Sequence, residues 1–387
     1  MTHNIDPRFL QETETPFYFY DSKLLDHTLD TIKQHASKGP FKVHYAVKAN
    51  SNAAILRRIS AAGFGADCVS GGEINAALDA GFAAADIFYA GVGKTDREIL
   101  LGLRKGIGCF NVESIEELDI IAEIAGREGI VAPVALRVNP DIDAHTHHYI
   151  TTGLEENKFG IDMRLLDRAI EKTVASPWLR LRGLHFHIGS QITITEPFVL
   201  LSERINTLTA DLRRRGIPLE FINVGGGLGI DYDDPDANPV ADFAGFFDVV
   251  AANLHVEPGQ EIHCEPGRAV VAQCGSLITR VLYVKEGIGR RFAIVDAGMT
   301  DLLRPALYGA HHRIERLTAE GATDTSEATA RYDVVGPVCE STDTFAVDEP
   351  LPELHRGDLL ALRSAGAYGE SMASTYNLRS LPRTILA

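Results

Sequence analysis

Short apolar runs recur along most of the chain, and segments with a helical pattern separate them. The runs occupy residues 41–47, 65–69, 87–90, 109–112, 134–138, 183–188, 220–224 and 261–265. Continuous apolar runs of this length between helical segments are typical of buried parallel strands. Eight strands that alternate with helices predict an α/β fold, a (β/α)8 barrel. Two helix starts are also expected, at Asp21-Ser22 and at a Ser114–Glu117 capping box.

The pattern changes after Arg268. Apolar runs at 276–284, 291–296, 331–336 and 358–363 follow one another with few helical segments between them. This spacing predicts a second, mostly antiparallel β domain, into which the aromatic run at 17–20 could pair. The polar stretch 320–330 is expected to be a loop. We therefore predict a barrel over residues 29–269 and a sheet domain over 1–28 and 270–387.

The net charge and the cysteine content exclude several classes of function. The 387 residues include 37 Lys plus Arg and 53 Asp plus Glu, a net charge of −16. Such an acidic chain is a poor binder of nucleic acid or anionic membrane. Its N-terminus lacks the pattern of a signal peptide, and no apolar run approaches the ~18 residues of a membrane helix. Five scattered cysteines without metal-ligand spacing indicate reduced thiols in a cytoplasm and no metal site.

Candidate chemistry begins with Lys48, at the end of the first predicted strand. Burial would penalise its ammonium, lower its pKa and make it a nucleophile able to form a Schiff base with a carbonyl cofactor. The simpler alternative is a surface lysine at a strand end. The other strand ends carry Asp67, Arg137, His187, the glycines 225–227 and Glu265, and in barrels this end holds the active site.

Three of these strand ends suggest how a cofactor is held. Consecutive glycines at 225–227 let backbone N–H groups close on a phosphate, although they could also form a flexible turn. His187 could stack on a planar ring, with Ser190 donating to the phosphate, or could be an ordinary core histidine. Glu265 could pair with a protonated pyridine nitrogen, or with Arg137 or Arg268. His185 and His263 are assigned to packing or to supporting the residues that would contact the cofactor. The combination indicates pyridoxal phosphate.

Five motifs carry a resemblance to a known family. They are Tyr-Ala-Val-Lys-Ala-Asn (45–50), His-Ile-Gly-Ser-Gln (187–191), Gly-Gly-Gly (225–227), Glu-Pro-Gly-Arg (265–268) and Cys-Glu-Ser (339–341). From about residue 17 to 381 the chain resembles the fold-type III pyridoxal-phosphate-dependent decarboxylases, most closely those that act on diaminopimelate. The resemblance implies an alanine racemase-like barrel and a cytoplasmic enzyme of lysine biosynthesis.

The resemblance also implies roles for individual residues. Lys48 would form the internal aldimine, and Cys339 would donate the proton from the other subunit of a homodimer with shared active sites. The implied cofactor-binding residues are Lys48, Asp67, Arg137, His187, Ser190, Gly226, Gly227, Glu265, Gly267, Arg268 and Tyr368. The implied substrate-binding residues are Arg268, Arg304, Tyr308, Glu340 and Tyr368.

The charges of these residues suit meso-diaminopimelate, whose far end is a zwitterion. Arg268 and Arg304 could clamp its carboxylate, and Glu340 could take its ammonium. Ornithine, whose far end is an amine alone, would not need the arginines. Decarboxylases acting on ornithine, arginine or carboxynorspermidine remain alternatives. An alanine racemase would place arginine where Glu265 stands, and a non-catalytic cofactor carrier would not need residues 270–387.

Overall fold

The structure, a computed structural model, describes residues 5–140, 158–324 and 326–387. The chain divides into two compact units. The barrel unit comprises Thr28–Gly229 and Asp242–Gly267, and the sheet unit comprises Met1–His27, Ile230–Ala241 and Arg268–Ala387. No sequence pattern indicated that 230–241 would group with the sheet. The domain limits 29–269, with 1–28 and 270–387, remain a prediction.

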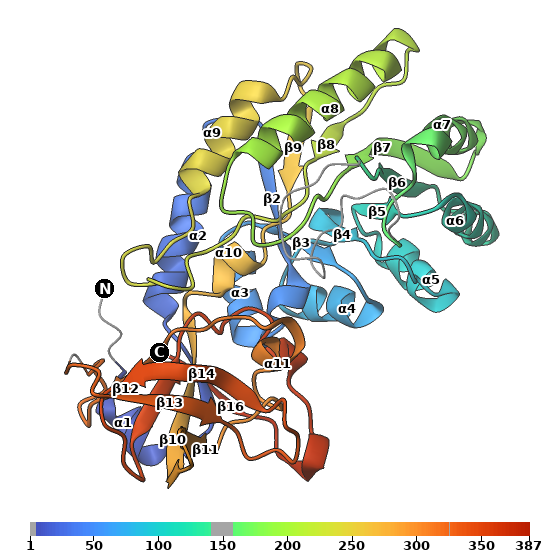
Figure 1. Ribbon diagram of the computed structural model, residues 1–387. Coiled ribbons are helices and arrows are strands. Elements are labelled where there is room, and N and C mark those ends of the chain that lie inside the picture. Colours follow the sequence, from blue (N-terminus) through green and yellow to red (C-terminus); the bar gives the residue numbers. More distant parts are fainter. Residues whose placement is uncertain (1–4, 141–157, 325) are drawn as a thin grey trace. The chain divides into compact units, whose positions relative to one another are not determined.

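The barrel unit contains the eight-stranded closed barrel that the apolar runs predict, seen in Figure 1. All neighbouring strands are parallel, and β2 closes the barrel against β9 by pairing Phe41 with Ile262. Most strand residues are buried, which explains why the runs are apolar instead of alternating. The strands are β2 Phe41–Ala46, β3 Gly65–Cys68, β4 Ile87–Tyr89, β5 Cys109–Val112, β6 Ala132–Arg137, β7 Leu179–His185, β8 Phe221–Asn223 and β9 Glu261–Cys264.

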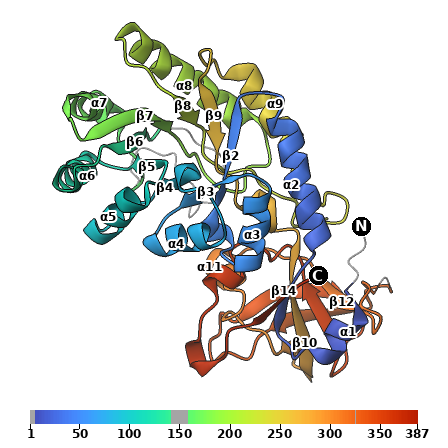
Figure 2. The same ribbon diagram turned by 180° about the vertical axis from the view of Figure 1, so that it is seen from behind.

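Helices surround these strands, as Figure 2 shows from behind. Each buries an apolar stripe against the barrel; in α3, for example, Ile55, Leu56 and Ile59 are buried. The helices are α2 Ser22–Ala36, α3 Ala53–Ala61, α4 Gly71–Asp79, α5 Asp96–Lys105, α6 Ile115–Glu128, α7 Leu166–Ala175, α8 Glu196–Arg214 and α9 Phe243–Asn253. Short 3-10 turns occur at η1 Val47–Ala49, η2 Ala84–Asp86 and η3 Met163–Leu165.

The helix starts follow the sequence only in part. The Asp21 carboxylate accepts hydrogen bonds from the N–H groups of Lys23 and Leu24, as expected of a helix cap. α6 also begins where expected, with Ser114 as its N-cap and the Ser114 hydroxyl accepting from the Glu117 N–H. Only the second bond of the predicted capping box, from the Ser114 N–H to the Glu117 side chain, is not made between these residues. The Glu117 carboxylate instead accepts from the Glu113 N–H and pairs with Lys94. A buried ammonium is a stronger partner for a carboxylate than the Ser114 N–H would be.

His263, assigned to packing from the sequence, does pack inside the barrel. Its ring stacks on Phe221 with centroids 4.3 Å apart, and its Nδ1 lies 3.1 Å from Nε2 of His44. Burial, followed by nearby Arg182, lowers the pKa of His263 to about 3. These rings fill the barrel interior and leave the chemistry to the carboxyl ends of the strands.

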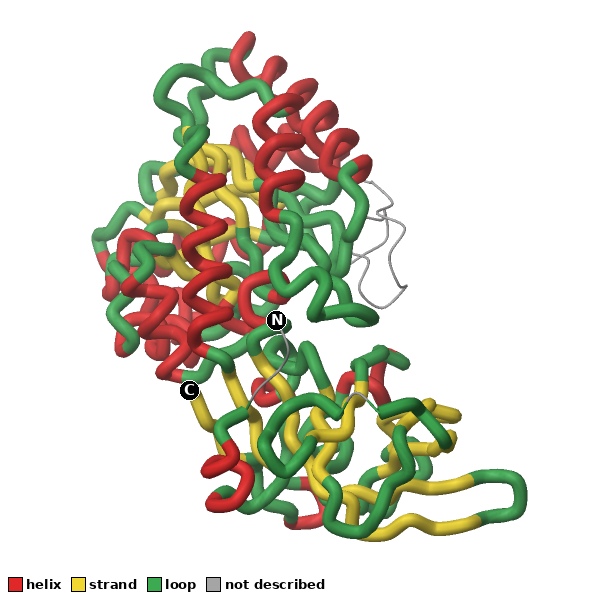
Figure 3. The backbone as a smooth tube through the Cα atoms, turned by 90° about the vertical axis from the view of Figure 1, so that its left-hand side faces the viewer, coloured by secondary structure: helices red, strands yellow, loops and turns green. Residues whose placement is uncertain are grey.

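The sheet unit contains the second, mostly antiparallel sheet, whose strands are yellow in Figure 3. The aromatic strand β1 joins it, antiparallel to β10 and parallel to β16. Its strands are β1 Phe17–Tyr20, β10 Gly275–Glu286, β11 Arg291–Val295, β12 Ile314–Leu317, β13 Ala330–Val335, β14 Thr344–Leu351, β15 Leu359–Leu362 and β16 Arg383–Leu386. Its helices are α1 Pro7–Glu12, α10 Arg268–Val271 and α11 Arg304–Tyr308, with turns η4 Glu370–Met372 and η5 Tyr376–Leu378.

Three of these strands escaped the sequence analysis. Strands β12 and β14 lie at the two ends of the sheet order, and β16 pairs only with β1. Such strands carry charged residues and, in β14, a proline, so their apolar pattern is weak. The described residues of 320–330 form turns and loop up to the start of β13, as expected. In the described part of the chain, no helix combines the length and apolar character needed to cross a membrane.

Candidate functional site

Lys48 lies in η1, directly after β2, at the carboxyl end of the barrel. Val47 and Ala49 on either side are buried, but Lys48 itself is exposed. The expectation that burial activates this lysine was therefore wrong for the chain alone. The reason is that β2 ends at Ala46, so Lys48 lies beyond the packed interior. An accessible amine at a barrel mouth can still meet a carbonyl compound that enters there.

Glu265, which follows β9, is the centre of a buried hydrogen-bond network. One carboxylate oxygen accepts from the side-chain amides of Asn111, at 3.2 Å, and Asn223, at 2.6 Å. The other lies 2.9 Å from Nε2 of His185. The alternative ion pair with Arg137 is not made, because Arg137 binds Glu113 at 2.8 Å. Polar side chains thus hold Glu265 at the end of the barrel without neutralising it by an arginine.

Two buried carboxyl groups at the strand ends differ in charge. Burial alone would raise the pKa of Glu265, but the His185 imidazole and the hydrogen bonds from His185 and Asn223 outweigh it and hold the pKa low. Burial, followed by the negative charge of Glu265, raises the pKa of Asp67 well above its usual value. The surroundings of Glu265 therefore favour its ionised form, and those of Asp67 favour its neutral form. Oδ1 of Asp67 is buried and has no hydrogen-bond partner among the described residues.

His187 follows β7 and is half-buried. Its Nδ1 accepts a hydrogen bond from the Gly226 N–H at 3.3 Å, which assigns its proton to Nε2. Burial, followed by the positive charges of Arg137 and Lys48, lowers the pKa of His187 well below its usual value. The ring is therefore neutral at physiological pH. A neutral, partly accessible ring is suited to stacking on a flat ligand.

The glycines 225–227 form a closely packed turn and not a flexible one. Gly225 and Gly227 have φ angles of +74° and +111°, which favour glycine. A Cβ on Gly226 would lie 2.2 Å from the Glu265 carbonyl oxygen. The backbone after β8 thus lies directly against the chain that carries Glu265. Gly267 is equally confined, with a Cβ placed 3.0 Å from Cβ of Ala46, just before η1. Ser190 lies half-buried in the loop after β7.

We expect Gly226→Ala to destabilise the protein by roughly 1–3 kcal/mol, the usual cost of overpacking, because either strand end must move. Urea denaturation measures this change. Gly72→Ala in α4 is the matched control, since its Cβ would meet its nearest neighbour at 3.6 Å. Equal denaturation midpoints for the two variants would contradict the close approach of β8 and β9.

Within the sheet unit, Arg268 and Arg304 approach the same tyrosine. Both arginines are buried. Arg268 donates to the Tyr232 hydroxyl at 2.7 Å, and the Arg304 guanidinium lies 4.9 Å from the centre of the Tyr232 ring. Arg268 also lies 5.0 Å from the ring centre of Tyr368. Within the described residues, Arg304 forms no ion pair with a carboxylate. Two buried guanidinium groups beside one ring have the charge and the donors that an anion would need.

Tyr368 has an unusual backbone, with a φ angle of +56° at a residue other than glycine. Strain of this kind costs about 1–3 kcal/mol and is concentrated at functional sites. It occurs where the Tyr368 ring meets Arg268. Tyr308, another predicted substrate residue, ends α11 and is half-buried.

Cys339 and Glu340 are exposed in a loop of the sheet unit. The buried Asp343 shapes this loop by accepting from the Val338 N–H at 2.7 Å. The Cys339 N–H donates to the Asn377 side chain at 3.0 Å, and the Tyr376 hydroxyl donates to Glu340 at 2.6 Å. The loop is therefore ordered although its two reactive side chains face solvent.

Several polar partners of the site residues were not predicted from the sequence. His185 was named as a packing or supporting residue, and it does bind Glu265. Asn223 was not named, although the need of a buried Glu265 for hydrogen-bond partners points to the neighbouring strand ends. Asn111 lies one residue before the end of β5. Tyr232 and His312, which contact Arg304, had no comparable signal because they lie outside the barrel rhythm.

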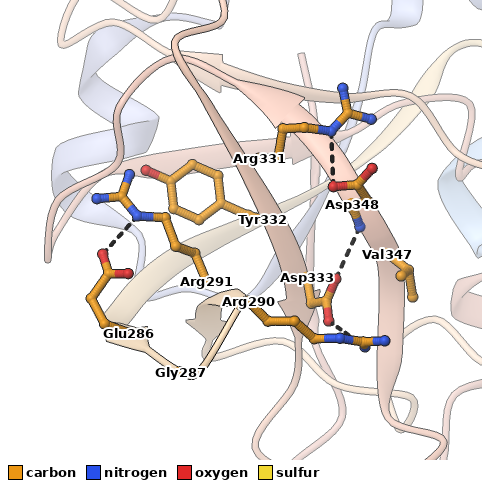
Figure 4. Close-up of a pocket in the computed structure, with 10 residues that line it drawn as sticks. Glu286, Gly287, Arg290, Arg291, Arg331, Tyr332, Asp333, Val347 and Asp348 are labelled. Carbon is orange, nitrogen blue, oxygen red and sulfur yellow. Dashed lines mark hydrogen bonds and ion pairs between the residues drawn. The ribbon is translucent and has the colours of Figure 1, made fainter.

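A pocket of about 430 Å³ in the sheet unit is a poor candidate for the site (Figure 4). Its three arginines already pair with acidic residues: Arg290 with Asp333, Arg291 with Glu286 and Arg331 with Asp348. None of the predicted site residues lines it. The charged side chains of this pocket neutralise one another, whereas Arg304 has no carboxylate partner among the described residues.

Comparisons with known proteins agree with this interpretation. The family model described as "Pyridoxal-dependent decarboxylase, pyridoxal binding domain" matches residues 25–272. A protein named diaminopimelate decarboxylase from Bacteroides thetaiotaomicron is 56% identical over 371 residues, which cover 96% of this chain and 95% of that relative. Both matches include the barrel unit and the motifs at its strand ends.

Solved structures show the same likeness. Diaminopimelate decarboxylase from Helicobacter pylori, crystallised as a mutant in complex with L-lysine, superposes with a TM-score of 0.92 at 41% identity. That match covers 98% of this chain and 93% of the other. A lysine/ornithine decarboxylase from Vibrio vulnificus, at 22% identity and a TM-score of 0.81, covers 98% of this chain and 96% of the other and shares the fold.

Proposed function

Because the chain belongs to the pyridoxal-dependent decarboxylase family, we propose that it converts meso-2,6-diaminopimelate to L-lysine and CO2, the last step of lysine biosynthesis. The observation that carries this proposal is the buried guanidinium of Arg304, which has no carboxylate partner among the described residues. A substrate that is only an amine at its far end would leave this charge unpaired. Relatives that bear the name diaminopimelate decarboxylase support the same choice.

The strand ends of the barrel fit pyridoxal phosphate. Glu265 is an ionised, buried carboxylate able to pair with a protonated pyridine nitrogen. Oδ1 of Asp67 lacks a hydrogen-bond partner among the described residues, as expected of a group that serves a ligand. The neutral His187 ring offers a stacking face. The glycine turn at 225–227 brings backbone without side chains to the strand ends, where the Gly225 and Gly226 N–H groups already donate to Asn223 and His187. When bound, pyridoxal phosphate supplies an electron sink for the electron pair left by departing CO2.

We assign the following roles to the residues of the barrel mouth and their neighbours. Nζ of Lys48 would hold the cofactor's aldehyde and give it up to the substrate amine. Glu265 keeps the proton on the pyridine nitrogen, and Arg137 acts through its pair with Glu113, whose carboxylate binds the N–H groups of Gly91 and Gly160. Ser190, Gly226, Gly227, Gly267, Arg268 and Tyr368 hold the phosphate. These roles keep a negative charge, a stacking ring and an amine at one end of the barrel.

The far end of the substrate is assigned to the sheet unit. Arg268 and Arg304 bind the carboxylate, Glu340 the ammonium, and Tyr308 and Tyr368 complete the site. Arg268 follows Glu265 by three residues, so the chain itself holds it within about 10 Å of the cofactor's carboxylate partner. The carboxyl group that leaves is therefore the one opposite the arginine-bound end.

We also assign the proton that replaces CO2 to Sγ of Cys339, acting from the second subunit of a homodimer. Cys339 and Glu340 are exposed beside Tyr376, Leu378 and Leu381, which are 50%, 97% and 56% exposed. Leu378 also has a φ angle of +57°, a strained conformation for leucine. An apolar, strained and ordered surface next to two reactive side chains is a reasonable interface for another copy.

The direct experiment is incubation of the purified, cofactor-loaded protein with meso-diaminopimelate, following CO2 and L-lysine. Ornithine, arginine and carboxynorspermidine serve as competing substrates. Preferential turnover of one of these compounds would show that it, and not diaminopimelate, is the substrate. The assignment to the cytoplasm rests on the four buried free cysteines, which suit a reducing compartment.

Arg304→Ala is expected to weaken diaminopimelate binding by about 2–5 kcal/mol, the cost of removing one partner of a buried charge pair. Cofactor content should stay unchanged, because Arg304 is assigned to the far end of the substrate and not to the cofactor. Steady-state kinetics and cofactor absorbance measure the two effects. Arg331→Ala is the matched control, an exposed arginine of the same unit already paired with Asp348. Unchanged kinetics in Arg304→Ala would remove Arg304 from the site.

A further inference from the structure

Arg304 is held by His312, a buried residue between α11 and β12 that is 2% exposed. Nδ1 of His312 lies 2.8 Å from the Arg363 carbonyl oxygen, and Nε2 lies 2.7 Å from NH1 of Arg304. A carbonyl can only accept a hydrogen bond and a guanidinium can only donate one. His312 must therefore carry its proton on Nδ1 and present a lone pair to Arg304.

The neutrality of His312 follows from the same contacts. A second proton on Nε2 would face the guanidinium N–H directly. Burial, followed by the charge of Arg304, lowers the pKa of His312 to about 3, so the ring stays neutral across the working pH range. The remaining neighbours are the edge of Tyr232, at 5.3 Å between ring centres, and the charges of His311 and Arg268.

A second buried arginine in the same unit, Arg363, shows how carboxylate partners differ in effect from a neutral histidine. Arg363 pairs with Glu315 at 2.7 Å and with Asp236 at 3.1 Å. Two carboxylates hold that guanidinium in place, and they also neutralise it. His312 holds Arg304 in place but leaves its positive charge for another anion. The imidazole and the Tyr232 ring, 4.9 Å from the guanidinium, together fix the direction of Arg304.

We propose that His312 is a positioning residue that determines specificity: it orients Arg304 as a neutral acceptor and so preserves the charge that binds the substrate's far carboxylate. The substrate class that this arrangement selects is an amino acid with a carboxylate remote from the reacting carbon. The inference rests on the proposed function for the identity of that carboxylate. The hydrogen bonds and burial of His312 are independent of it.

The test compares His312→Gln with His312→Glu, which have the same shape and differ in charge. Either side chain can place an oxygen near the position of Nε2. His312→Gln should keep KM for diaminopimelate within about threefold, because an acceptor remains. His312→Glu should raise KM about tenfold or more with little change in kcat, because its carboxylate neutralises Arg304. His311→Glu is the matched control, since the neighbouring His311 is exposed and its ring lies near the exposed Asp233.

A binding measurement separates positioning from folding. Calorimetry with each cofactor-loaded variant should show that His312→Glu weakens L-lysine about tenfold and leaves cadaverine, the same chain without the carboxylate, unchanged. Equal effects of Gln and Glu, or equal losses for L-lysine and cadaverine, would overturn the proposal. Absence of turnover in the wild-type protein would refute the proposed function, and the L-lysine to cadaverine comparison would still decide the role of His312.

Discussion

Replacing Lys48 by alanine is expected to lower decarboxylation by at least about 1,000-fold, which corresponds to about 4 kcal/mol of transition-state stabilisation. The expectation follows from the position of Lys48 in η1, beyond β2 and accessible from the barrel mouth. Without this amine, neither the covalent hold on the cofactor's aldehyde nor its exchange with the substrate amine can occur. Turnover of meso-diaminopimelate measures the loss.

A chemical readout independent of activity accompanies this prediction. Borohydride should fix the cofactor on Lys48 of the wild-type protein, as mapped by peptide mass spectrometry, and should give no adduct in Lys48→Ala. Lys42→Ala is the matched control, because Lys42 is an exposed lysine of β2 whose nearest acid, Glu261, is 3.8 Å away. A borohydride adduct on another lysine would show that Lys48 is not the attachment point.

The barrel could be predicted because its strands are buried on both faces and therefore read as continuous apolar runs. The edge strands β12 and β14 could not, because charged residues interrupt their apolar pattern. The positions of Lys48 and Glu265 followed from the rule that barrel chemistry lies at strand ends. The exposure of Lys48 did not follow from this rule, because it depends on the residue at which β2 ends.

The supporting residues of the site depend on tertiary contacts. Asn111 and Asn223 become partners of Glu265 only when the barrel closes and brings three strand ends together. Tyr232 belongs to the segment Ile230–Ala241, which leaves the barrel unit and groups with the sheet unit. His312 acts through a carbonyl 51 residues away in the chain. The spacing of residues along the sequence does not indicate such contacts.

The proposal that two subunits share each active site makes the sharpest prediction, because activity should then return when two inactive proteins are mixed. Lys48→Ala and Cys339→Ala homodimers are each expected to be nearly inactive. After mild dissociation and random reassortment of equal amounts, about half of the dimers are heterodimers. In each heterodimer one site carries both lesions and the other carries none. Roughly a quarter of all sites should therefore recover in a cofactor-saturated assay.

The matched control mixes Lys48→Ala with Glu265→Gln. Both residues belong to the barrel unit, so every heterodimer site keeps one lesion and no activity should return. The exposed position of Cys339, beside the strained and fully solvent-facing Leu378, is what distinguishes it from these barrel residues. Native mass spectrometry verifies that heterodimers have formed in both mixtures. If Lys48→Ala with Cys339→Ala stays as inactive as the control mixture, Cys339 serves the barrel of its own subunit, and the exposed loop needs another explanation.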